Sequence, residues 1–129
     1  MNFNHAMIYS RNVEGALSFY RDQLGLTSLQ EFDHQGTIVY ARLKSPGSDS
    51  TIALHLLRPG EELNTGGERL YFEVGNLDEV VERLVRAGIV FTKRPTLMPW
   101  GWKHAYLDDP DGHEVSLYRA GDKRLEKAA

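Results

Sequence analysis

The chain has 129 residues, of which 41% are hydrophobic and 26% charged, and its formal net charge is -3. Its length predicts one globular domain, or two small halves that share a core. The weak charge and the absence of a basic run argue against nucleic acid as a partner. The lack of a long apolar run argues against a membrane span or a signal peptide, and the absence of cysteine excludes disulfides and thiolate chemistry. We therefore expect a cytoplasmic protein.

The first half of the chain has the pattern of a β-α-β-β-β unit. Residues 3–9 alternate as a strand does, with His5 and Tyr9 on one face. Asn12 is suited to cap a helix that Gly25 ends, and apolar residues recur between them at helical spacing. Three further strands are expected, at residues 26–32, 37–43 and 51–57.

The second half begins the same order again after a loop rich in glycine. A strand at residues 69–74 leads to a helix that Asn76 caps and Gly88 ends, and a short strand follows at residues 89–93. The last part, residues 98–118, has the form of a β-hairpin.

An internal repeat relates the two halves. The segment RNVEGAL at 11–17 can be placed over GNLDEVV at 75–81, an offset of 64 that matches Asn with Asn and Glu with Asp. We therefore predict a single domain of two modules, at about 1–60 and about 67–120. A short charged tail at residues 121–129 follows them.

The hairpin is organised by the turn Asp109-Pro110-Asp111-Gly112, in which proline is favoured at the second position and glycine at the fourth. If Asp109 pairs with His113, counting outward places Tyr106 opposite Ser116 and His104 opposite Tyr118. The turn chemistry also explains the two aspartates without a catalytic role. One face of the hairpin is small and apolar and suits a covering helix, which leaves the other face for a ligand. That other face carries Trp102, His104, Tyr106, Ser116 and Tyr118.

The predicted fold class is α+β. Each module buries one face of its sheet under its helix, so two βαβββ modules can pair their sheets into a cupped, barrel-like surface with the helices outside. By their places in their strands, position 5 should be equivalent to 69, and 55 to 116. The inner face would then bring together His5, His55, Arg69 and Ser116.

The chain resembles the vicinal oxygen chelate superfamily, which includes glyoxalase I, bleomycin-resistance proteins and extradiol dioxygenases. The resemblance lies in HAMIYSRNVEGALSFYRDQLGL at the start and DPDGHEVSLY near the end. It implies paired βαβββ modules and a homodimer. It also implies a divalent cation held by His or Glu at four convergent positions, where this chain has two histidines, Arg69 in place of a His and Ser116 in place of the family's Glu.

One prediction is a glyoxalase-like metalloenzyme of the lyase, isomerase or dioxygenase type. His5 and His55, with His104 or Glu114 as a third ligand, would hold Zn, Ni, Fe or Mn, and Glu114 or Glu73 would accept a proton. Arg69 argues against a nearby cation, unless an anionic substrate lies between them. We expect no nucleotide cofactor.

The alternative is a metal-free binding protein that resembles bleomycin-resistance proteins and holds an aromatic or cationic small molecule by stacking. Glu73 and Glu114 would supply negative charge. The substrate-binding residues of the two hypotheses together are Arg69, Tyr71, Trp102, Tyr106, Ser116 and Tyr118.

Overall fold

The computed structural model describes residues 1–120. The chain divides into two compact units, Met1–Asn64 and a second that begins at Thr65. The division falls close to the module boundary expected from the repeat. The charged tail predicted at residues 121–129 lies outside the described residues.

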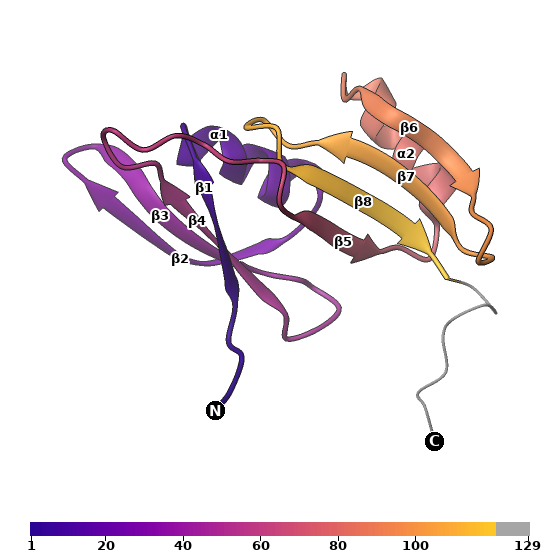
Figure 1. Cartoon of the computed structure of the whole chain (residues 1–129), viewed down its shortest axis with the longest axis horizontal. Coiled ribbons are helices and arrows are strands. Elements are labelled where there is room, and N and C mark those ends of the chain that lie inside the picture. Colours follow the sequence, from indigo (N-terminus) through magenta and orange to yellow (C-terminus); the bar gives the residue numbers. More distant parts are fainter. Residues whose placement is uncertain (121–129) are drawn as a thin grey trace. The chain divides into compact units, whose positions relative to one another are not determined.

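The first unit is one four-stranded sheet with a helical segment on one face (Figure 1). The strand order is β1-β4-β3-β2, in which β1 and β4 run parallel and the other pairs antiparallel. Its elements are β1 (Ala6–Ser10), α1 (Val13–Leu17), η1 (Ser18–Gln23), β2 (Thr27–His34), β3 (Thr37–Lys44) and β4 (Thr51–Leu56).

The helical segment of this unit begins where the sequence predicts. The side chain of Asn12 accepts a hydrogen bond from Gly15 N at 3.1 Å, which satisfies one of the free N–H groups at a helix start. The second part, η1, is a π-helix, in which Leu24 N donates to Phe19 O, five residues back. Tyr20 is fully buried in this part, so the wider turn places a large ring in the core.

The second unit repeats this architecture. Its sheet has the order β5-β8-β7-β6, with β5 and β8 parallel, and α2 lies against one face (Figure 1). The elements are β5 (Arg69–Glu73), α2 (Leu77–Arg86), β6 (Phe91–Leu97), β7 (Lys103–Asp108) and β8 (Glu114–Arg119). The strand expected at residues 89–93 therefore begins later and continues to Leu97.

Alternation along the strands separates a buried face from a second face in each sheet. In the first unit Leu43 and Leu54 are fully buried, and α1 contacts both of their strands. In the second unit Leu107 and Leu84 are fully buried, and α2 contacts β6 and β8. Each helix thus covers the apolar face of its own sheet, and the fold is α+β with two βαβββ modules, as predicted. The described residues contain no helix with the length and apolar character that a membrane crossing requires.

Candidate functional site

The hairpin of the second unit has the register that the sequence predicts. Tyr106 pairs with Ser116 and His104 with Tyr118. At the turn, Asp109 N donates to His113 O at 2.8 Å and Gly112 N donates to Asp109 O at 3.0 Å.

The side chain of Asp109 has the structural role expected of it. Its Oδ1 accepts from the backbone N–H groups of Asp111 and His113, both at 2.9 Å. This carboxylate therefore stabilises the turn that joins β7 to β8.

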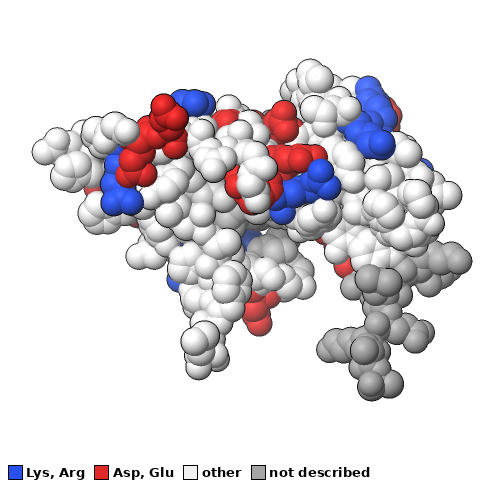
Figure 2. Space-filling model, in the orientation of Figure 1, with Lys and Arg blue, Asp and Glu red and all other residues white. Residues whose placement is uncertain are grey.

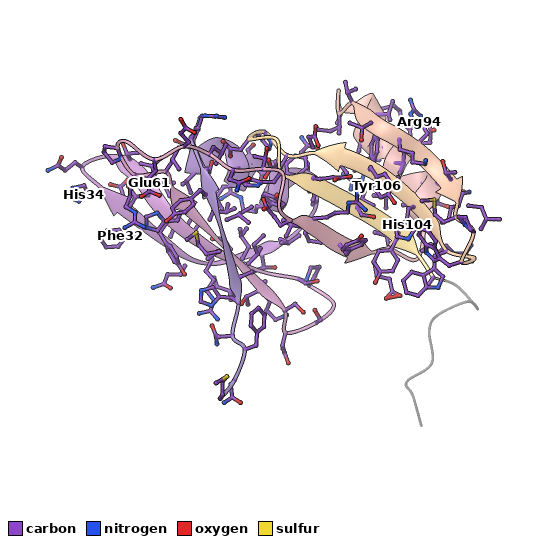
Figure 3. The ribbon with its side chains drawn as sticks, viewed as in Figure 1. Phe32, His34, Glu61, Arg94, His104 and Tyr106 are labelled. Atoms are coloured by element: carbon purple, nitrogen blue, oxygen red, sulfur yellow. The ribbon has the colours of Figure 1, made fainter. Side chains whose placement is uncertain are left out.

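An aromatic surface covers the face of this sheet opposite α2. Tyr71 pairs with Ser116 across the parallel strands, so β5 adds its ring to those of the hairpin. Trp102 and Tyr118 stack with centroids 5.2 Å apart and planes inclined by 7°. We call this surface the aromatic face, and its residues are Tyr71, Trp102, His104, Tyr106 and Tyr118. Figure 3 labels His104 and Tyr106 on β7.

His104 lies at the centre of the aromatic face. Its ring stacks on Tyr118 at 5.3 Å and meets Tyr71 edge-on at 6.1 Å. The residue is only 3% exposed, and its Nδ1 is 2.9 Å from Ser116 Oγ. Burial lowers the pKa of His104, and the charge of Arg69 lowers it further. The lowered pKa favours the neutral imidazole, which acts as an uncharged hydrogen-bonding group.

Arg69 is held at one end of the aromatic face by three neighbours. Its guanidinium forms an ion pair with Glu114 at 3.0 Å, donates to the Tyr71 hydroxyl at 3.3 Å and lies 4.8 Å from the centroid of Tyr106. The hydrogen bonds with Tyr71 and then Glu114 raise the pKa of Arg69. Because Glu114 balances this charge, the pair presents a locally neutral edge to a ligand. Figure 2 shows that charges of opposite sign are also close together elsewhere, since acidic and basic side chains lie next to one another in small groups.

Glu73 and Glu114 were both predicted as proton acceptors. Glu73 ends β5, whereas Glu114 begins β8 beside the first residue of β5. Glu114 is the strand neighbour of Arg69, while Glu73 is the neighbour of Tyr118. Four residues of extended chain separate these two places, about 13 Å. Glu73 and Glu114 therefore do not act on the same atom of a small ligand, and a catalytic role for either one stays a prediction.

His5 and His55, the two predicted metal ligands of the first unit, share a face of their sheet, but they do not lie side by side. His55 pairs with Tyr9 of β1, and the rings of these two residues are 5.8 Å apart. Ala6 pairs with Ile52, so His5 lies beside Thr51, about 13 Å from His55 along the strands. The Nδ1 atom of His55 also contacts the backbone oxygen of Leu56 at 2.7 Å.

The pairing registers correct the predicted equivalence of positions 55 and 116. Position 5 has the same offset from 69 as Asn12 has from Asn76. Because β1 pairs Ala6 with Ile52 and β5 pairs Arg69 with Glu114, Thr51 then corresponds to Glu114 and Ala53 to Ser116. His55 corresponds instead to Tyr118.

The superfamily resemblance implies four positions for metal ligands. In this chain His5, Ala53, Arg69 and Ser116 occupy them. Only an imidazole among these is a usual ligand, and a guanidinium repels a cation. No group of three or more His, Cys, Asp or Glu side chains within residues 1–120 is arranged to hold a metal. These residues do not fit a divalent cation, and metal binding by His5, His55 and His104 stays a prediction that the geometry does not favour.

His113 has a role that sequence reasoning missed. This histidine is 2% exposed, and its Nδ1 lies 2.5 Å from Glu68 Oε1. This contact joins the start of β8 to the residue before β5. The only sign of this contact in the sequence is a glutamate directly before β5. Glutamates at such places are too common to identify one as the partner of His113.

The sequence comparisons agree with this fold. Residues 2–117 match the family model of the Glyoxalase/Bleomycin resistance protein/Dioxygenase superfamily. A comparison with curated proteins found no similar sequence.

Three solved structures illustrate the structural relatives. A superfamily member from Sphaerobacter thermophilus is 27% identical, with a TM-score of 0.74 over 92% of this chain and 98% of the other. TnmS3, an antibiotic binding protein from a Streptomyces species, is 22% identical, with a TM-score of 0.74 over 92% and 96%. A lactoylglutathione lyase from Agrobacterium tumefaciens is 19% identical, with a TM-score of 0.71 over 95% and 96%. The repeated βαβββ units and the match over nearly the whole described chain lead to one conclusion: this chain belongs to the Glyoxalase/Bleomycin resistance protein/Dioxygenase superfamily.

Proposed function

We propose that this protein binds a planar aromatic small molecule on the aromatic face of its second unit, without a metal ion. The observation that carries the proposal is the parallel stack of Trp102 on Tyr118 beside a buried, neutral imidazole. Stacked rings on an open sheet face offer a flat apolar platform, and they contribute about 0.5–1.5 kcal/mol for each aromatic pair. TnmS3, which has the same fold, is described as an antibiotic binding protein, and this supports the proposal.

The charges near the platform favour a ligand that is flat and mainly uncharged. Arg69 and Glu114 neutralise each other, so neither is left to attract a strongly charged ligand. Tyr71 is 54% exposed at the edge of the platform, so its ring can add contact area to a bound ring. We infer that binding depends on ring area and shape more than on charge, as stacking and burial do.

Tyr118→Leu tests the proposal against Tyr40→Leu, which removes a tyrosine from the sheet of the first unit. The probes are fused-ring aromatics of increasing size, from indole to acridine, titrated by calorimetry with and without EDTA. We expect micromolar binding that EDTA does not change, weakened about tenfold by Tyr118→Leu and unchanged by Tyr40→Leu. Equal loss in both variants, or loss of all binding with EDTA, would contradict the proposal.

The metalloenzyme hypothesis has no comparable support in the donor set, and lactoylglutathione lyase is similar to this chain in fold alone. A homodimer and a cytoplasmic location stay predictions. Sedimentation velocity over a hundredfold range of protein concentration tests the homodimer.

A further inference from the structure

One nitrogen on the aromatic face is buried without a hydrogen-bond partner. Within residues 1–120, His104 Nε2 and Arg42 Nε are the two buried side-chain nitrogen or oxygen atoms that have no partner. Arg42 satisfies part of its guanidinium through Asn4 and Thr51. For a neutral imidazole, one unpaired nitrogen is half of its hydrogen-bonding capacity, and leaving it unpaired costs about 1–3 kcal/mol.

The partner on the other ring nitrogen determines which atom carries the proton. Ser116 is fully buried, and within the described chain its hydroxyl has one partner, Nδ1 of His104. If Nδ1 carried the proton, the serine proton would have no acceptor and Nε2 would have no donor, so two groups would be unsatisfied. If Nε2 carries it, the hydroxyl donates to Nδ1 and only the Nε2–H group is unsatisfied. The second tautomer is therefore the more stable one, and His104 presents a donor.

Aromatic rings surround this donor. Tyr118 and Trp102 stack on the imidazole, while Trp100 and Tyr71 meet it edge-on at 5.5 and 6.1 Å. A ring face is a weak acceptor and recovers only part of a normal hydrogen bond. Trp100 and Tyr71 are also the exposed members, at 56% and 54%, so they are the rings of this group that a ligand meets first.

Resting on the proposed function, we infer that His104 is the specificity-determining residue of the aromatic face. Its Nε2–H group donates a hydrogen bond to a carbonyl or comparable acceptor oxygen on the ring system of the ligand. The preferred ligands are thus planar aromatic ketones and related carbonyl compounds. An aromatic ring with only hydrocarbon edges, or with an N–H donor at that position, leaves Nε2–H unpaired.

Three probes of nearly identical shape separate these cases: 9-fluorenone carries an acceptor, fluorene carries neither group and carbazole carries a donor. Titrated by tryptophan fluorescence quenching, fluorenone should bind about tenfold more tightly than fluorene, and carbazole no more tightly than fluorene. Equal affinities, or tightest binding by carbazole, would overturn the role of His104 and leave aromatic binding itself intact. If none of the three binds, the proposed function fails together with the inference.

Variants show which donor the carbonyl meets. His104→Phe should remove the preference for fluorenone and still bind fluorene. Arg69→Met should keep the preference, although it removes the guanidinium donors at one end of this face. Loss of the preference in Arg69→Met alone would assign the contact to the guanidinium instead. Thermal unfolding of each variant confirms that it is folded.

The tautomer can be measured with no ligand. In protein with ¹⁵N-labelled histidine, the signals of the five histidines are compared with those of His104→Phe to assign His104. We expect a neutral ring at pH 7.5 with the proton on Nε2, and a shift of that N–H on addition of fluorenone. A proton on Nδ1 would overturn the inference whatever the ligands do.

Discussion

Tyr9 of β1 lies directly beside His55 of β4, and their rings meet edge-on at 5.8 Å. Because this pairing leaves His5 beside Thr51, His5 and His55 are about 13 Å apart along the strands. Imidazoles that share a zinc ion must both approach it to about 2.0–2.1 Å. The two rings therefore do not form a common pair of ligands within this sheet.

Zinc titration of the wild-type protein and two variants checks this geometry. We expect His5→Ala and His55→Ala to leave zinc affinity within about twofold of wild type, because neither histidine supports the other. Calorimetry with ZnCl₂ in a weakly chelating buffer gives the affinities, and His34→Ala serves as the exposed control. A stoichiometric site that either of the first two variants abolishes would restore the metalloenzyme hypothesis.

The predicted equivalence of His55 and Ser116 was wrong because side chains in a strand repeat every two residues. Side chains at positions 53 and 55 point to the same face of the sheet. The alternation of a strand therefore does not show which of the two is equivalent to Ser116. Only the pairing of β1 with β4, which joins segments more than forty residues apart, fixes the choice. Such a pairing leaves no local mark in the sequence.

The register of the hairpin, in contrast, could be predicted because its turn fixes that register locally. Asp109-Pro110-Asp111-Gly112 specifies both the turn and the cross-strand pairs, and the structure has those pairs. The repeat likewise predicted the order of elements. The Glu68 contact of His113 could not be predicted, since it joins two residues 45 positions apart.

Stability should depend on pH through His104. Burial and then Arg69 lower the pKa of this histidine in the folded protein, whereas the unfolded chain has the ordinary value of about 6.5. The unfolded state thus binds more protons below that value. The contribution of the neutral ring is fully present above about pH 6.5 and is lost as the pH falls toward the folded pKa.

His104→Phe should therefore lose less stability than the wild type between pH 7.5 and 5. Urea unfolding at several pH values measures the difference, with the exposed His34→Phe as a matched control that follows the wild type. Parallel pH dependences for wild type and His104→Phe would contradict the lowered pKa.

The turn of the hairpin should be sensitive to one methyl group. Gly112 has φ of 92°, a backbone conformation that costs an ordinary residue about 1–2 kcal/mol. A Cβ at this position meets only Thr65 at 3.8 Å, so the cost comes from the backbone and not from a clash. Gly112→Ala should lower the free energy of unfolding by about that amount.

Gly47→Ala is the control for this prediction. It adds the same group where nothing lies within 4 Å and where φ is not positive. We expect a change within about 0.5 kcal/mol in urea unfolding. Equal effects of the two substitutions would show that the turn does not require a left-handed residue.

The contact between Glu68 and His113 should stabilise the second unit. His113 is 2% exposed, so Glu68→Ala removes the partner of a buried Nδ1 and should cost about 1–3 kcal/mol in the free energy of unfolding. Glu68→Gln keeps an acceptor oxygen at the same reach, and it should recover much of the loss if the hydrogen bond matters more than the charge. Urea unfolding at pH 7.5 measures both, with Glu62→Ala as an exposed control. If Glu68→Gln is as unstable as Glu68→Ala, the negative charge of Glu68 matters more to this contact than its acceptor oxygen does.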